Sequence, residues 1–234
     1  MYRFLREPKW IVAHLLTLLL LTAFMCAGVW QFGRHQARSE RNSSVLDRSN
    51  DQFLTADDLF SANSDIEFRL VQLEGLWSED DAVLIRNRSH KEAAGCHLAV
   101  PLVSDVSRAT LVTVGWLPQS SCDTYKFELP LGDVSLTGRV RLSQKRGAIG
   151  ARDASTGVLT SLARTDVSRI GQQVSYPLAP VYVELIASEP ELVDAFPLEP
   201  PPTNLGPHLG YAVQWFLFFA VGIVGYPLVL RRHS

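Results

Sequence analysis

Three of the six histidines lie in or beside long uncharged segments of the chain, where an imidazole is unusual. His208 opens the second such segment, His35 follows the end of the first, and His14 lies inside the first with no evident polar partner. A neutral imidazole ligates haem iron or another metal, and a polar ring in an apolar segment is a functional candidate. The alternative is a histidine that hydrogen-bonds water or lipid headgroups. His208 and His35 are the candidate ligands, and both interpretations stay open.

Aromatic residues gather near the same ends of the two segments. Trp30 and Phe32 lie on the first, and Tyr211, Trp215 and Phe216 lie on the second. Tyr211 and Trp215 are four residues apart and share one face of a helix. Such residues form the aromatic belt at a membrane interface, or else a flat face that packs a porphyrin beside His208. Tyr211 and Trp215 are therefore candidate neighbours of a bound cofactor.

Two of the three cysteines, Cys96 and Cys122, lie between the uncharged segments, whereas Cys26 lies inside the first. Cys96 and Cys122 form either a disulfide, worth about 3 kcal/mol for a loop of this length, or two separate buried thiols. Cys96 and His97 point to opposite faces of a strand, which disfavours a joint metal or nucleophilic site. The sequence contains no phosphate-binding glycine loop, paired-histidine zinc motif or nucleophile elbow, so we expect no catalytic residues and no enzyme activity.

The uncharged segments, residues 10–33 and 208–230, are 24 and 23 residues long. A helix needs about 20 residues to cross a hydrocarbon core of about 30 Å. We therefore expect two transmembrane helices in a lipid bilayer. Small residues that would let them approach closely are Gly28, Gly33, Gly210, Gly222 and Gly225.

The region between the helices is acidic, since residues 34–207 hold 17 basic and 23 acidic side chains. A surface of this charge repels phosphate backbones, which excludes a nucleic-acid partner. Its apolar content excludes a disordered chain, and two segments are too few for a multi-span channel.

Basic residues flank the end of each segment that lies nearer a terminus of the chain, and they predict the topology. Arg3, Arg6 and Lys9 precede the first helix, and Arg231 and Arg232 follow the second, so both termini are expected in the cytoplasm. The predicted parts are a cytoplasmic N-terminus (1–9), a transmembrane helix (10–33), an extracytoplasmic β-rich domain (34–196), a proline-rich linker (197–207), a second transmembrane helix (208–230) and a cytoplasmic C-terminus (231–234). The arginine-rich composition is typical of a bacterium of high GC content, so we expect the protein in a bacterial plasma membrane. The mitochondrial inner membrane is the alternative.

Alternating apolar and polar residues predict short strands in the central domain. The expected strands cover residues 68–75, 82–85, 98–103, 111–116, 134–142 and 181–187. Two short helices are expected, one over residues 56–62 after the capping pair Thr55 and Asp58, the other over 166–170. The fold class is thus a membrane protein with two helices flanking a mainly β (α+β) domain, its sheet antiparallel or barrel-like.

Four sequence features together resemble the surfeit locus protein 1 family. They are the segment 28–34 at the end of the first helix, the pair Asn87-Arg88, the Gly-Trp-Leu-Pro sequence at 115–118, and the segment from Asn204 through the His-Leu-Gly-Tyr-Ala-Val-Gln-Trp-Phe sequence at 208–216. The resemblance covers nearly the whole chain. Each motif is weak alone, and the four are specific in this order and spacing.

The resemblance implies an assembly factor of haem-copper cytochrome c oxidase that assists delivery of haem a to the catalytic subunit. It implies that His208 is a haem a ligand, with Tyr211 and Trp215 near it and His35 as a possible second ligand. The oxidase catalytic subunit is the implied partner. The alternatives are a protein that stabilises the oxidase complex without binding haem, and an extracytoplasmic enzyme with a pocket of titratable groups in the β domain.

The sequence departs from the family pattern at two places. The family has an arginine before the Gly-Trp pair, whereas this sequence has Val114. An apolar residue at this position suits a strand buried on both faces. Gly206 and Pro207 lengthen the approach from Asn204 to His208, which could shift the histidine relative to the bilayer.

Overall fold

The computed structural model describes residues 7–61, 64–105, 108–124, 127–192 and 195–232. They fall into two compact units, one formed by residues 1–44 with 202–234 and the other by residues 45–201. Arg3 and Arg6, on which the topology prediction partly rests, lie outside the described residues, as do residues 233–234 of the predicted C-terminus.

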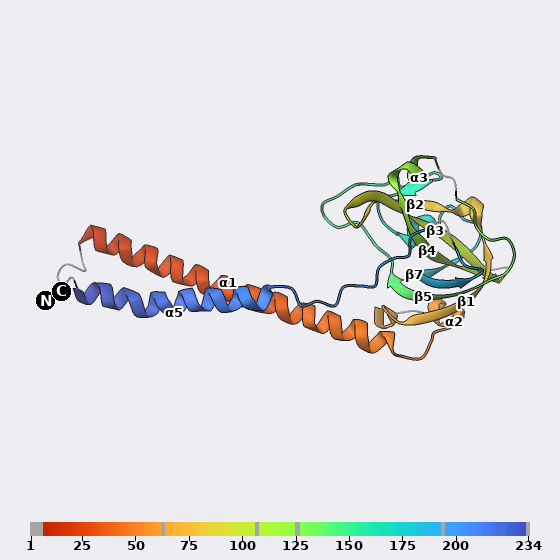
Figure 1. Cartoon of the computed structure of the whole chain (residues 1–234). Helices are drawn as coiled ribbons and strands as arrows, with labels where there is room; N and C mark the ends of the chain where they lie inside the picture. The colour runs from red at the N-terminus through yellow and green to blue at the C-terminus, as the bar shows by residue number, and fades with distance from the viewer. Residues whose placement is uncertain (1–6, 62–63, 106–107, 125–126, 193–194, 233–234) are drawn as a thin grey trace. The chain divides into compact units, whose positions relative to one another are not determined.

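The first unit is built from two long helices, α1 (Pro8–Ser49) and α5 (His208–Arg232) (Figure 1). Both are long and apolar enough to cross a membrane, and nearly all of their apolar stretches are exposed. Exposed apolar helices of this length are typical of membrane spans rather than of a soluble core. The expectation of two apolar helices at the two ends of the chain is therefore confirmed.

Helix α1 continues past Gly33 to Ser49, so residues 34–49, which the sequence analysis assigns to the β-rich domain, are helical. No glycine or proline interrupts this stretch. The hydroxyl groups of Ser43, Ser44 and Ser49 donate to the carbonyl oxygens four residues earlier, which keeps these side chains compatible with the helix. The charged residues after Gly33 therefore mark the end of the apolar stretch and not the end of the helix.

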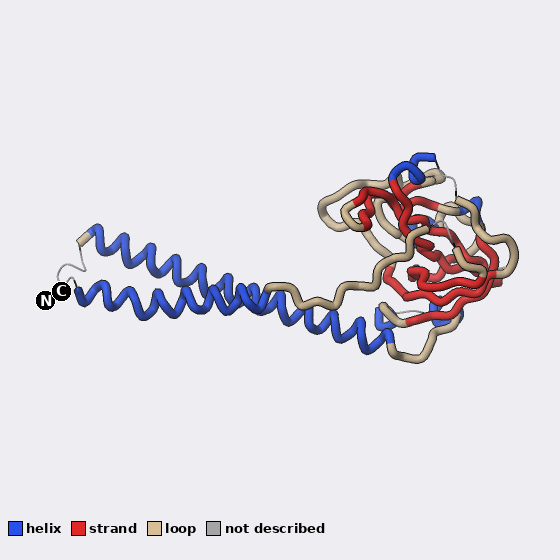
Figure 2. The backbone as a smooth tube through the Cα atoms, in the orientation of Figure 1, coloured by secondary structure: helices blue, strands red, loops and turns tan. Residues whose placement is uncertain are grey.

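The second unit contains a seven-stranded sheet in the order β1-β5-β7-β4-β3-β2-β6. Its strands are β1 (Leu70–Trp77), β2 (Val83–His90), β3 (Ala93–Asp105), β4 (Arg108–Pro118), β5 (Val134–Leu142), β6 (Ser161–Leu162) and β7 (Leu178–Glu189). A further pairing of β1 with β3 closes β1, β5, β7, β4 and β3 into a ring (Figure 2). The barrel-like alternative of the sequence analysis is thus correct.

The sheet is mixed rather than wholly antiparallel, because β4 pairs with β7, and β2 with β6, in parallel. Alternating apolar residues predict a strand but not its direction, so this arrangement was not accessible from the pattern. Strand β4 lies between β3 and β7, and its residues from Ala109 to Leu117 are all buried. Val114 is therefore buried in a central strand, as its apolar side chain predicts.

Two apolar clusters cover the two faces of the central strands. The larger includes Val71, Leu73, Leu98, Val100, Leu102, Val112, Val114, Val134, Leu136, Val140, Val181 and Val183. The smaller includes Val83, Ile85, Ala99, Leu111, Leu162, Val167, Ile170 and Tyr182. Neighbouring residues of one strand belong to different clusters, as the alternation of a strand requires.

Short helices fill the connections: α2 (Ala56–Phe60), α3 (Gln119–Thr124), α4 (Val167–Ile170), and the 3-10 turns η2 (Ser64–Ile66) and η3 (Glu79–Asp81). Thr55 and Asp58 form the predicted capping box of α2, whose predicted last residue, 62, lies outside the described residues. Asp166 is the N-cap of α4 and accepts from the Arg169 amide. Strand β5 has the predicted limits, whereas β6, with only two residues, was missed.

Candidate functional site

One face of α1 lies toward α5, or toward the chain that enters it, and carries a residue at every third or fourth position. The spacing of four and three residues is that of neighbouring turns on one helix face. The residues of this face, which we call the pairing face, are Phe24, Gly28, Gln31, His35, Arg38 and Asn42. Five of them contact α5 or the residues just before it.

Gln31 lies beside His208, the first residue of α5. Nδ1 of His208 is 2.9 Å from Oε1 of Gln31. An amide oxygen can only accept, and a neutral imidazole that donates to it from Nδ1 keeps a lone pair on Nε2. A metal-binding histidine is typically held in this way, with one ring nitrogen donating to a neighbour and the other left for the metal. The sequence alone gave no reason to select Gln31.

His35 lies one helical turn beyond Gln31 on the pairing face. Its Nδ1 atom is buried and has no hydrogen-bond partner among the described residues. A buried polar atom without a partner is uncommon, and a bound water, ion or ligand would explain it. The two histidines selected from the sequence therefore both belong to this end of the helix pair, which we call the His208 end.

The chain entering α5 is fixed by two further residues of the pairing face. Arg38 donates from Nε to the carbonyl oxygen of Asn204 (2.7 Å) and from Nη2 to its side-chain oxygen (2.8 Å). Asn42 donates to the carbonyl oxygen of Thr203 (2.6 Å). Gly206 then adopts a φ of +66°, which an L side chain rarely adopts. The longer approach to His208 is thus held as a turn against α1.

The aromatic side chains at the His208 end have different surroundings. Trp215 stacks on Phe24 with ring centroids 5.7 Å apart and also contacts Phe218, so it is occupied by packing between the helices. Tyr211 is 49% exposed and Trp30 is 61% exposed. Of the two aromatic residues selected beside His208, Tyr211 is thus the one whose ring is free for another molecule.

His14, for which the sequence offered no polar partner, has one in the structure. Its Nδ1 atom hydrogen-bonds to the hydroxyl group of Tyr226 on α5, and the rings meet edge to face. The residues are 212 positions apart, so neither could be assigned to the other from the sequence. In an apolar medium such a bond supports helix association, so His14 has a structural role in the pair.

In the β unit, two of the family motifs meet. The residues from Gly115 to Pro118 continue strand β4 and pair with residues 95–98 of β3. The Nε1 of Trp116 donates to the carbonyl oxygen of Arg88 (3.2 Å), beside the β-bulge between Ile85 and Arg88. Trp116 and Phe196 exchange two backbone hydrogen bonds of 2.9 and 3.0 Å. This contact anchors the chain before the proline-rich linker.

A cavity of about 220 Å³ lies beside this motif, lined by Ser89, His90, Lys91, His97, Trp116, Glu184, Leu198 and Glu199. The rings of His90, Trp116 and Phe196 form a mutual cluster, with centroids 5.4 Å (His90–Trp116), 5.9 Å (His90–Phe196) and 5.7 Å (Trp116–Phe196) apart. Burial, aided by the charge of Arg88, lowers the pKa of His97 to about 4, so that ring is neutral at pH 7. No group of three or more metal-binding side chains occurs in the described part of the chain.

Cys96 and Cys122 are joined by a disulfide, with Cα atoms 6.1 Å apart. The bond ties β3 to α3, and Cys96 is buried in the larger apolar cluster. Cys26, in α1, is a free and exposed cysteine.

Two apolar helices around a central α+β domain define a class of membrane protein, and comparison with known proteins gives its family. The model of the SURF1 family, the surfeit locus protein 1 family, matches residues 18–220, and the chain therefore belongs to that family. Uncharacterized SURF1-like proteins of Mycobacterium bovis and of Mycobacterium tuberculosis strain H37Rv are each 24% identical to it over 231 residues. These matches cover 95% of this chain and 83% of each relative.

Proposed function

We propose that this protein is an assembly factor of haem-copper cytochrome c oxidase that holds haem a through His208 while the catalytic subunit matures. The observation that carries the proposal is the hydrogen bond between His208 and Gln31: with Nδ1 of His208 as the donor, Nε2 would hold the haem iron. Membership of the SURF1 family supports the oxidase as partner.

The donor set at the His208 end suits a haem that must later be released. Haem held by one histidine is released more readily than haem held by two, because the histidines of the oxidase then have fewer bonds to the iron to displace. His35, whose Nδ1 atom has no partner among the described residues, is the alternative single donor at this end. Tyr211, half exposed, is available to pack against a planar macrocycle, whereas Trp215 orients the helices through Phe24.

The role is that of a carrier, with no catalytic residue assigned. Its spans are residues 10–33 and 208–230 in a bacterial plasma membrane, with both termini cytoplasmic and the β unit outside. Two observations support this topology: Arg231 and Arg232 end α5, and a disulfide in the β unit is typical of an oxidising compartment.

The decisive experiment is the absorption spectrum of the full-length protein purified from cells that make haem a. The wild type should carry a haem a band and His208→Ala should lose it while still inserting into the membrane. Gln36→Ala is the control, because it changes an exposed position of α1 outside the pairing face and should keep the band. An unchanged spectrum in His208→Ala would refute the proposal. A wild type without haem that co-purifies with the oxidase in equal amounts would instead support the stabilising protein.

A further inference from the structure

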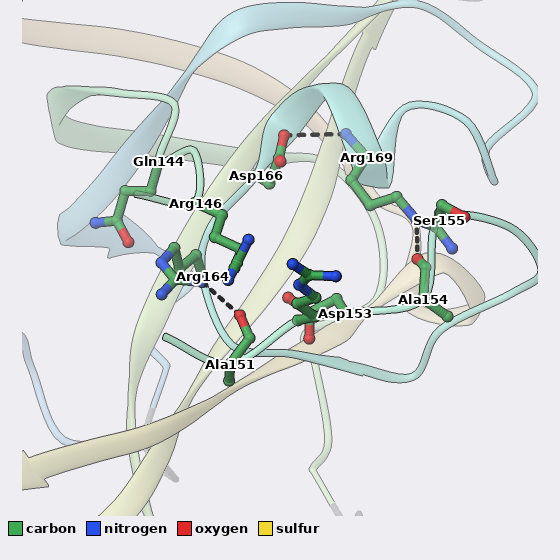
Figure 3. Close-up of a pocket in the computed structure, with 10 residues that line it drawn as sticks. Gln144, Arg146, Ala151, Asp153, Ala154, Ser155, Arg164, Asp166 and Arg169 are labelled. Carbon is green, nitrogen blue, oxygen red and sulfur yellow. Dashed lines mark hydrogen bonds between the residues drawn. The ribbon is translucent and has the colours of Figure 1, made fainter. Parts of the chain in front are cut away.

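The β unit contains a second cavity, of about 310 Å³, between the segment 144–155, the residues after β6, and α4 (Figure 3). Four arginines line it, Arg146, Arg152, Arg164 and Arg169. Figure 3 shows Arg146 and Arg164 on one side and Arg169 on the other, with the 151–155 segment along the edge. This concentration of positive charge is unusual in a domain that is acidic as a whole.

The arginines are held by backbone carbonyl groups. Arg169 is buried and donates to the carbonyl oxygens of Ala154 (2.8 Å) and Gly157 (2.6 Å). Arg164 donates to that of Ala151 (3.0 Å). In the described part of the chain, none of the four arginines forms an ion pair with a carboxylate. Their charges are therefore positioned without being neutralised.

The two acidic residues of the cavity are already engaged. Asp153 forms a 2.6 Å ion pair with Arg86 and accepts from the backbone amide of Ala163. Asp166 caps α4 by accepting from the Arg169 amide (3.1 Å). Because each guanidinium group has five N–H donors and the hydrogen bonds observed among the described residues use at most two of them, several donors remain for another molecule.

The positive charges also act on a neighbour. Burial lowers the pKa of Arg88, and the charge of Arg164 acts in the same direction. Arg88 in turn donates to Gln144, which lines the cavity. The buried charge of Arg169, beside three further cations, costs free energy that a bound anion would offset.

We propose that this cavity binds a phosphate group. Guanidinium groups pair with phosphate oxygens in a bidentate manner, and here they approach from three separate segments of the chain. That arrangement suits the several oxygens of a tetrahedral phosphate better than a flat carboxylate, which one arginine can satisfy. Ser155 adds a hydroxyl donor at the edge. The phosphate comes either from the headgroup of an anionic lipid or from a soluble phosphate.

The test is calorimetric titration of inorganic phosphate into the full-length protein in an uncharged detergent. The variant Arg146→Gln/Arg152→Gln removes two exposed arginines that few contacts hold. It should bind at least about tenfold more weakly, because charge-assisted bonds are lost. The control Lys145→Gln/Arg108→Gln removes the same charge outside the cavity and should bind as the wild type does. Circular dichroism confirms that both variants are folded.

A second arm separates the two sources of phosphate. The titration is repeated in phosphatidylcholine nanodiscs with and without phosphatidylglycerol. Weaker phosphate binding in the presence of phosphatidylglycerol identifies the lipid headgroup as the ligand, and unchanged binding identifies a soluble phosphate. Absence of binding by the wild type, equal weakening in both double variants, or tighter binding of citrate than of phosphate would each overturn the proposal. None of these outcomes depends on haem.

Discussion

Nδ1 of His208 lies 2.9 Å from Oε1 of Gln31, although 177 positions separate them in the chain. One residue is the first of α5 and the other belongs to the pairing face of α1. The orientation of the candidate ligand therefore depends on both helices. A candidate site of this kind exists only when the two ends of the chain have come together.

The role of Gln31 gives the first prediction. Gln31→Leu should leave His208 in place but free its ring to rotate and to change tautomer, and haem affinity should fall by about 10- to 100-fold, as is usual for loss of a partner that orients a metal ligand. Haem titration of the purified protein measures this. Gln36→Leu, an exposed position of the same helix, is the control and should bind as the wild type does. Equal affinities of Gln31→Leu and the wild type would contradict the orienting role.

Gly28 gives a prediction about helix packing. A Cβ atom at this position would lie 2.6 Å from Cε1 of Phe216, so Gly28→Leu must displace that ring and separate the helices. We expect a loss of about 1–3 kcal/mol in the stability of the helix pair and a weaker haem band. Thermal unfolding in detergent, followed by tryptophan fluorescence, measures the first effect. Gly33→Leu faces open space and should change neither property; an equal effect of both substitutions would show that residue size alone matters.

The sequence predicts some elements of the fold well. Alternation gave the limits of β5, and the apolar run of β4 indicated a strand buried on both faces. The two apolar segments predicted the helices but not the end of α1, because residues 34–49 are mostly polar and include weak helix formers, four serines, an asparagine and an aspartate, so they resemble a connection.

Long-range pairings could not be predicted in the same way. The parallel pairing of β4 with β7, and the contacts of His208 with Gln31 and of His14 with Tyr226, join residues whose separation leaves no trace in local periodicity. The spacing of Gln31, His35 and Arg38 is visible in the sequence and indicates one helix face. It does not say what the face contacts. The histidines could therefore be selected by type and position, but their partners required the structure.

Gly115 should be essential to the anchoring of Phe196. A Cβ atom there would lie 2.7 Å from both the Cβ atom of Ala195 and the carbonyl oxygen of Phe196, while Phe196 is held to Trp116 by two backbone hydrogen bonds. Gly115→Ala should therefore lower the unfolding free energy of the β unit by about 1–3 kcal/mol. Urea unfolding measures this. Gly147→Ala, which meets no neighbouring atom, should unfold at the same urea concentration as the wild type.

The disulfide should contribute a stability that depends on redox conditions. Cys96 and Cys122 are 26 residues apart, and closing a loop of that length is worth about 3 kcal/mol. Cys122→Ser should therefore destabilise the β unit by about this amount without reductant. In dithiothreitol the wild type should lose most of its advantage over the variant. Cys26→Ser, which removes a free cysteine, should unfold like the wild type. A difference between wild type and Cys122→Ser that persists in full under reduction would argue against the cross-link as its source.

The stability of the β unit should depend on pH through His97. Burial, with the Arg88 charge acting in the same direction, lowers the pKa of His97 to about 4, whereas an exposed histidine has a pKa of about 6.5. Between these values the unfolded chain binds the proton more readily than the folded one, so stability falls as the pH is lowered from 6.5 to 4. The loss attributable to His97 should be at most about 3 kcal/mol, because each pKa unit corresponds to 1.36 kcal/mol.

Urea unfolding at pH 7, 6, 5 and 4.5 measures this loss and isolates the contribution of His97. His97→Gln should flatten the dependence over this range, since it removes the group that takes up the proton on unfolding. Arg88→Gln should flatten it in part, because loss of the neighbouring charge raises the pKa of His97 in the folded protein. If the wild type and His97→Gln lose stability at the same rate between pH 6.5 and 4.5, the buried imidazole is not the source of the acid sensitivity.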